Sequence, residues 1–158
     1  MADRLKPGDA LPDVSLPTQS GEMVRLRDLV GEKRLVIFFY PMDGSPICTR
    51  EACAFRDSYG SLRKLGAEVV GISPDTPESH GKFAGKHELP FLLLSDADGE
   101  AARAFGIGGF WKVLTGRVTY VVDEEGIVQE AYSSAIRAAK HVEKARQALE
   151  ALDAGHKE

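Results

Sequence analysis

The two cysteines of this chain, Cys48 and Cys53, are its clearest candidates for chemistry. They follow the most apolar stretch, Leu35 to Tyr40, which is typical of a buried β-strand. Pro41 and the polar residues after it predict a turn at the end of that strand. A thiol brought to the edge of a sheet in this way is a nucleophile once deprotonated, which indicates redox chemistry.

The residues just before Cys48 predict the start of a helix. Ser45 is a preferred N-cap and Pro46 a preferred first helical residue, so Cys48 is expected in the first turn. Unpaired backbone amides and the positive end of the helix dipole favour the thiolate there. The alternative is a small buried apolar residue, as most free cysteines are, and position alone leaves both interpretations open.

The spacing of the two cysteines argues against a permanent structural disulfide. In an ideal helix, residues five apart have Cα atoms separated by roughly 8.7 Å. A disulfide usually needs less than about 7 Å between Cα atoms. Cys48 and Cys53 therefore either never bond to each other or bond after the intervening helix has unwound.

With these residues in view, the chain resembles the peroxiredoxins. Pro41, Ser45 and Cys48 match the Pro-x-x-x-(Thr/Ser)-x-x-Cys signature of that family. The segment Cys-Thr-Arg-Glu-Ala-Cys-Ala-Phe-Arg-Asp, which begins at Cys48, is similar to the peroxiredoxin Q subgroup, also called bacterioferritin comigratory protein. The resemblance covers roughly residues 5–152 and includes three further segments, in the order that the family has them: residues 7–13, 71–80 and 116–123.

The resemblance implies a separate role for each cysteine. Cys48 would be the peroxidatic residue, whose thiolate attacks a peroxide oxygen and becomes a sulfenic acid. Cys53 would condense with that sulfenic acid to form an intramolecular disulfide, which thioredoxin or a similar dithiol protein would reduce. The implied function is reduction of hydrogen peroxide and organic hydroperoxides, with no metal, haem or flavin cofactor.

Two polar side chains are implied to assist Cys48. An arginine on a strand is usually solvated, but the resemblance implies that Arg117 lies beside the thiolate and stabilises charge on the leaving oxygen. Ser45 stands where the family more often has Thr. Besides capping the helix, its hydroxyl is implied to hydrogen-bond the peroxide or the thiolate.

Three further residues are implied at or near the substrate site. Glu51 lies one helical turn beyond Cys48 and is implied to orient Arg117, although a solvent-facing helix charge is nearly as good an interpretation. Pro41 belongs to the family signature. Ile47 replaces the glycine that is common in the subgroup. Its backbone N–H would still face substrate, but its larger side chain would narrow the pocket.

Two rival functions remain open at this point. A thiol-disulfide oxidoreductase on the same fold is disfavoured because the chain lacks Cys-x-x-Cys. A redox sensor would form the same oxidised cysteine and bind a partner without turnover. Repeated peroxide consumption in the presence of thioredoxin distinguishes an enzyme from a sensor.

Composition excludes several other classes of function. The chain has 158 residues and a net charge of −4, with no basic stripe, so nucleic acid and membrane are not expected partners. It lacks an apolar signal segment and is expected to be cytoplasmic, a single domain over residues 1–158 and monomeric, as the subgroup tends to be. No metal is expected because the four histidines show no metal-binding spacing: His80, His87, His141 and His156.

Alternating strand and helix patterns predict an α/β fold with a mixed central sheet flanked by helices. This order fits the thioredoxin-like fold that the resemblance implies, with an extra N-terminal β-hairpin over residues 14–16 and 23–26. Further strands are expected at 35–40, 68–73, 91–94, 117–122 and 127–132. Helices are expected at 48–65, from Thr76 towards His87, at 100–105, and from near Ser134.

Overall fold

A computed structural model describes residues 5–107, 118–133 and 138–156. Its elements follow one another in this order: β1 (Ser15–Pro17), β2 (Met23–Arg25), the 3-10 helix η1 (Leu26–Leu29), β3 (Arg34–Phe39), α1 (Pro46–Lys64), β4 (Ala67–Ser73), α2 (Pro77–His87), β5 (Leu92–Ser95), α3 (Glu100–Ala104), β6 (Val118–Val122), β7 (Val128–Ser133) and α4 (Ala138–His156).

The central sheet has five strands in the order β5-β4-β3-β6-β7. Strands β3, β4 and β5 are parallel, whereas β6 and β7 run antiparallel to their neighbours. The parallel strands are joined through α1 and α2, and the antiparallel pair is joined by a tight turn. The mixed α/β sheet and the N-terminal hairpin, formed by β1 and β2, are therefore both confirmed.

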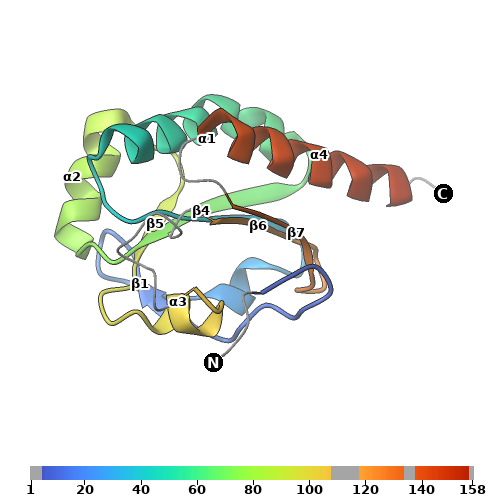
Figure 1. The fold of residues 1–158 in the computed structure, drawn as a ribbon, viewed down its shortest axis with the longest axis horizontal. Coiled ribbons are helices and arrows are strands. Elements are labelled where there is room, and N and C mark those ends of the chain that lie inside the picture. Colours follow the sequence, from blue (N-terminus) through green and yellow to red (C-terminus); the bar gives the residue numbers. More distant parts are fainter. Residues whose placement is uncertain (1–4, 108–117, 134–137, 157–158) are drawn as a thin grey trace.

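Strand β3 is buried on both faces and divides the core in two. Leu35, Ile37 and Phe39 face the hairpin and α3, whereas Val36 and Phe38 face α1 and α4. Figure 1 shows α1 and α4 side by side over one face, with the hairpin and α3 below the other. An uninterrupted apolar run, rather than an alternating one, is what a strand covered on both faces requires.

The packing of one phenylalanine fixes α1 on the sheet. The ring of Phe38 stacks on that of Phe55 with 4.6 Å between centroids, close over Gly71 of β4. A Cβ at Gly71 would lie 2.7 Å from Phe38 Cζ, so a larger residue there would displace the ring. This contact holds the helix that carries both cysteines.

The predicted elements all occur among the described residues, with ends that shift by one or two positions. Strand β5 begins at Leu92 rather than Phe91, and η1 replaces the expected end of the second hairpin strand. The expected start of the last helix, near Ser134, lies outside the described residues. The described part of that helix buries Val142, Ala145 and Leu149, which recur at three- and four-residue spacing along one face.

Candidate active site

Cys48 lies where the sequence placed it, in the first turn of α1. Ser45 caps this helix, because its Oγ accepts a hydrogen bond from the Cys48 backbone N–H at 3.3 Å, and Pro46 is the first helical residue. The left-handed backbone of Gly44 (φ +83°) turns the chain into the cap. The Cys48 side chain is fully buried, so its reaction partner must be small or the first turn must open.

Cys53 lies on the same helix and is half-buried. The two cysteines are not bonded to each other. Because α1 is helical from Pro46 to Lys64, the separation of roughly 8.7 Å expected from ideal helix geometry applies to their Cα atoms. A bond between them therefore requires that the helix unwind locally.

Glu51 faces the protein interior, so its interpretation as a solvated helix charge was wrong. Its side chain is 1% exposed, and Oε2 lies 3.4 Å from Nε2 of His141 on α4. His141 is also buried, and its Nδ1 shares a hydrogen bond of 2.7 Å with the Thr119 hydroxyl of β6. One turn beyond Cys48, a polar contact thus joins α1, α4 and β6.

Arg117 lies outside the described residues, so its role stays a prediction. Its neighbour Val118 pairs with Phe39, the last residue of β3. The beginning of β6 therefore lies beside the loop that leads to Cys48. In that loop Pro41 is half-buried, and Ile47 is half-buried at the second position of α1.

A buried polar network that the sequence did not predict surrounds the same loop. Asp43 accepts hydrogen bonds from the Tyr40 hydroxyl (2.5 Å) and the Ser79 hydroxyl (2.8 Å). Its Oδ2 also lies 2.8 Å from Nδ1 of the fully buried His80. The sequence shows that Asp43 is a charged residue two positions before the Ser45 cap. Nothing near it in the sequence identifies His80 on α2 as its partner.

These contacts set the ionisation of two groups. Burial alone would raise the pKa of Asp43, but hydrogen bonds from His80, Tyr40 and Ser79 outweigh it and hold the pKa below its ordinary value. Burial, together with the negative charge of Asp43, raises the pKa of Tyr40 well above its usual range. Asp43 is therefore a carboxylate and Tyr40 a neutral phenol.

Asp43, Asp75 and His80 bring potential metal ligands within 4.8 Å of one another. Hydrogen bonds already use these atoms: Asp75 Oδ2 accepts from the Asp43 backbone N–H and from the Ser73 hydroxyl, both at 2.7 Å. The cluster is accordingly a hydrogen-bond network that holds the loop to the β4–α2 connection.

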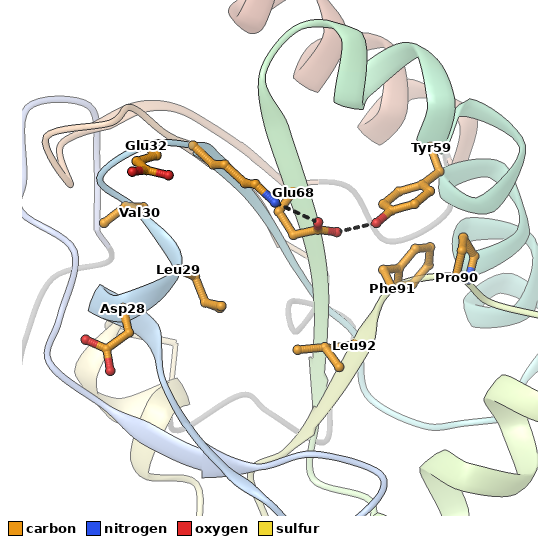
Figure 2. A pocket seen from close by; sticks show the side chains of 10 residues that line it. Asp28, Leu29, Val30, Glu32, Tyr59, Glu68, Pro90, Phe91 and Leu92 are labelled. Carbon is orange, nitrogen blue, oxygen red and sulfur yellow. Dashed lines mark hydrogen bonds and ion pairs between the residues drawn. The ribbon is translucent and has the colours of Figure 1, made fainter.

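A cavity of about 470 Å³ lies at the opposite end of the parallel strands. Figure 2 shows the Tyr59 hydroxyl directed at Glu68, to which it donates a hydrogen bond of 2.6 Å. Burial and this bond raise the pKa of Tyr59 to about 12, so it stays protonated. Neither cysteine lines the cavity, whose walls are mainly Asp28, Leu29, Tyr59, Glu68, Phe91 and Leu92.

Comparison with known proteins decides the family. The model of the AhpC/TSA family matches residues 7–131. The chain belongs to this family. A chloroplastic peroxiredoxin Q of Populus jackii is 43% identical over 150 residues, which are 94% of this chain and 70% of that one.

Two solved structures share the same fold. Peroxidoxin BcpB from Mycobacterium tuberculosis has a TM-score of 0.85 and 37% identity, covering 94% of this chain and 98% of its own. A bacterioferritin comigratory protein of Xanthomonas campestris, described with alkyl peroxide reduction activity, has a TM-score of 0.78 and 32% identity, covering 90% and 98%.

The protein is thus a peroxiredoxin, a thiol peroxidase on a thioredoxin-like fold. Both cysteines of this peroxiredoxin lie on the helix that follows β3. Within the described residues, no helix is long and apolar enough to cross a membrane. The chloroplastic location is that of its plant relatives, and a cytoplasmic location for this chain stays a prediction.

Proposed function

We propose that this peroxiredoxin reduces hydrogen peroxide and small organic hydroperoxides through Cys48, resolves the product with Cys53, and is recycled by thioredoxin or a similar dithiol protein. The observation that carries the proposal is the capped first turn of α1, which buries Cys48 and places Cys53 on the same helix. The alkyl peroxide reduction described for the Xanthomonas campestris relative supports the substrate class.

The reaction begins with attack of the Cys48 thiolate on one peroxide oxygen. The O–O bond breaks, an S–O bond forms, and the leaving oxygen takes a proton to give water or an alcohol. Cys48 is left as a sulfenic acid. The Ser45 hydroxyl orients the reactants beside the thiolate, and Arg117 stabilises the charge that develops on the leaving oxygen.

Resolution requires that α1 open. The Cys53 thiolate attacks the Cys48 sulfur, hydroxide leaves and is protonated to water, and the disulfide forms. A dithiol protein then reduces this bridge by two thiol-disulfide exchanges and becomes oxidised itself. In the reduced protein Cys53 is the more exposed of the two cysteines.

Intact mass after one equivalent of peroxide tests the two roles. The wild-type protein should lose two hydrogens, whereas Cys53→Ser should gain one oxygen and Cys48→Ser should be unchanged. With thioredoxin and its reductase, only the wild type should turn over many times. A Cys53→Ser protein that cycled normally would disprove resolution by Cys53, and a wild type that reacted once without turnover would be a sensor.

A further inference from the structure

The loop from Pro41 to Ser45, which leads into Cys48, is attached to the rest of the protein mainly through Asp43. Oδ1 accepts from Tyr40 at the end of β3, and Oδ2 accepts from Ser79 and contacts His80, both on α2. The side chains of Asp43 and His80 are 6% and 0% exposed. Two elements adjacent to the reactive helix thus meet on one carboxylate.

The polar contacts of His80 hold its ring on two sides. Nε2 lies 3.0 Å from the Leu94 carbonyl oxygen, which can accept but not donate, so Nε2 carries a hydrogen. Nδ1 lies 2.8 Å from a carboxylate oxygen of Asp43, which likewise accepts. Both ring nitrogens therefore face acceptors, and the buried ring connects the Asp43 carboxylate to the Leu94 carbonyl oxygen.

The charged groups around this pair come from the β4–α2 connection and from α2. Asp75, in the β4–α2 connection, accepts a hydrogen bond from the Asp43 backbone N–H. Lys82 and Lys86 of α2 line a hollow of about 210 Å³ together with Asp43. The ligand atoms of Asp43, Asp75 and His80 all lie within 4.8 Å of one another, so two acidic side chains meet the His80 ring.

The pair lies at the point where the peroxidatic turn begins. Asp43 is two residues before the Ser45 cap and five before Cys48. The chain between them contains one sharp turn, at Gly44, so the position of Asp43 sets where the Ser45 hydroxyl and the first amides of α1 lie. Because Asp43 precedes the helix, local unwinding between the two cysteines leaves its contacts in place.

We propose that Asp43 and His80 are positioning residues for the peroxide step: their buried contact fixes the loop so that Ser45 and the first turn of α1 hold peroxide against Cys48. This inference rests on the proposed function of Cys48. A small misplacement of reacting groups costs a large factor in rate, so release of the loop slows the reaction with peroxide. Simple alkylation of the same thiolate demands no such alignment.

The test compares two rates in each reduced, two-cysteine protein: sulfenic acid or disulfide formation with hydrogen peroxide, and alkylation by iodoacetamide. In Asp43→Ala the peroxide rate should fall about tenfold or more relative to the alkylation rate. Arg34→Lys, altered at the far end of β3, is the control for lowered stability and should leave the ratio of the two rates unchanged.

Two substitutions of His80 separate positioning from support of the fold. An Asn side chain places its N–H₂ near the position of Nδ1 and keeps the bond to Asp43, whereas Gln places it near Nε2 and keeps the bond to Leu94. His80→Asn should retain most of the peroxide rate and His80→Gln should lose it. The unfolding midpoint of each variant is measured alongside.

Two results would overturn the inference: an unchanged rate ratio in folded Asp43→Ala, whether or not both rates fall, or peroxide rates in the two His80 variants that follow their stability. Failure of the proposed function would look different, because the wild-type Cys48 would then not react with peroxide at all. A normal wild type with insensitive Asp43 and His80 variants would remove only the positioning role.

Discussion

At each end of β3, carboxylate groups contact a buried basic side chain, with different consequences. At the first residue, Arg34 is buried and donates to Glu124 Oε1 at 3.0 Å and to Asp153 Oδ1 at 2.7 Å. It also donates to the carbonyl oxygen of Leu65 at 3.1 Å. Its partners come from the β6–β7 turn and from the C-terminal ends of α4 and α1. Arg34 therefore connects the start of β3 to these three segments.

Beyond the last residue of β3, Asp43 is held by Tyr40, Ser79 and His80. These partners surround the loop that leads directly into Cys48. In open α/β sheets, the loops at the carboxyl ends of the parallel strands form the binding and catalytic sites. The same interaction therefore supports the fold at one end of the strand and the reactive turn at the other.

The largest effect on stability is expected at the Arg34 end. Arg34→Ala should lower the free energy of unfolding by about 3 kcal/mol, because it leaves two carboxylates and a carbonyl without their donor. Urea unfolding measures this loss. The peroxide rate of the folded variant should match the wild type; a parallel fall in that rate would mean that the two ends are coupled.

A large effect on rate, without one on stability, is expected from Arg117→Ala. Loss of its charge next to the leaving oxygen should lower the second-order rate with peroxide by about thirtyfold, which corresponds to about 2 kcal/mol of transition-state stabilisation. Stopped-flow kinetics on the reduced protein measure it. A wild-type rate would show that Arg117 has been misassigned.

Two N-caps provide a matched comparison of smaller size. Ser45 caps α1 and Thr76 caps α2, each with a proline at the next position and each accepting from the backbone three residues on. Either change to Ala should lower the free energy of unfolding by about 1 kcal/mol. The Ser45 change alone should also slow the peroxide reaction. Equal kinetics in both variants would leave Ser45 with capping as its whole role.

The smallest effect is expected in acid. The folded-state pKa of Asp43 lies below its ordinary value, because hydrogen bonds from His80, Tyr40 and Ser79 outweigh burial. Its contribution to stability is therefore complete above the unfolded pKa of about 3.9 and is lost as pH falls through the folded pKa. The difference in unfolding free energy between wild type and Asp43→Asn should shrink in that window; a constant difference would contradict the lowered pKa of Asp43.

Local patterns were enough to predict most of the architecture and the peroxidatic turn. The Ser45 and Pro46 pair marked the start of α1, and Thr76 and Pro77 marked the start of α2, because capping depends on neighbours in the sequence. The apolar run of β3 indicated a strand covered on both faces. These features follow from short-range chemistry.

Contacts between distant segments were not accessible in the same way. His80 lies 37 residues from Asp43, and no periodicity says which buried histidine meets which carboxylate. Glu51 had the spacing of an exposed helix residue as much as of a buried one, and the packing of α4 against α1 decided its side. Such pairs depend on the tertiary arrangement, which a single sequence does not specify locally.

Glu51 lies between the two cysteines, and its contact with His141 bears on the reduction potential of the proposed disulfide. Formation of that bridge unwinds the backbone that carries Glu51, so the buried contact with His141 and Thr119 must rearrange in the oxidised form. Free energy lost from the fold on oxidation makes the bridge a stronger oxidant. The stability of the reduced form of α1 thereby favours reduction of the disulfide by the partner protein. Through His141, α4 contributes to the reduction potential of cysteines that lie on α1.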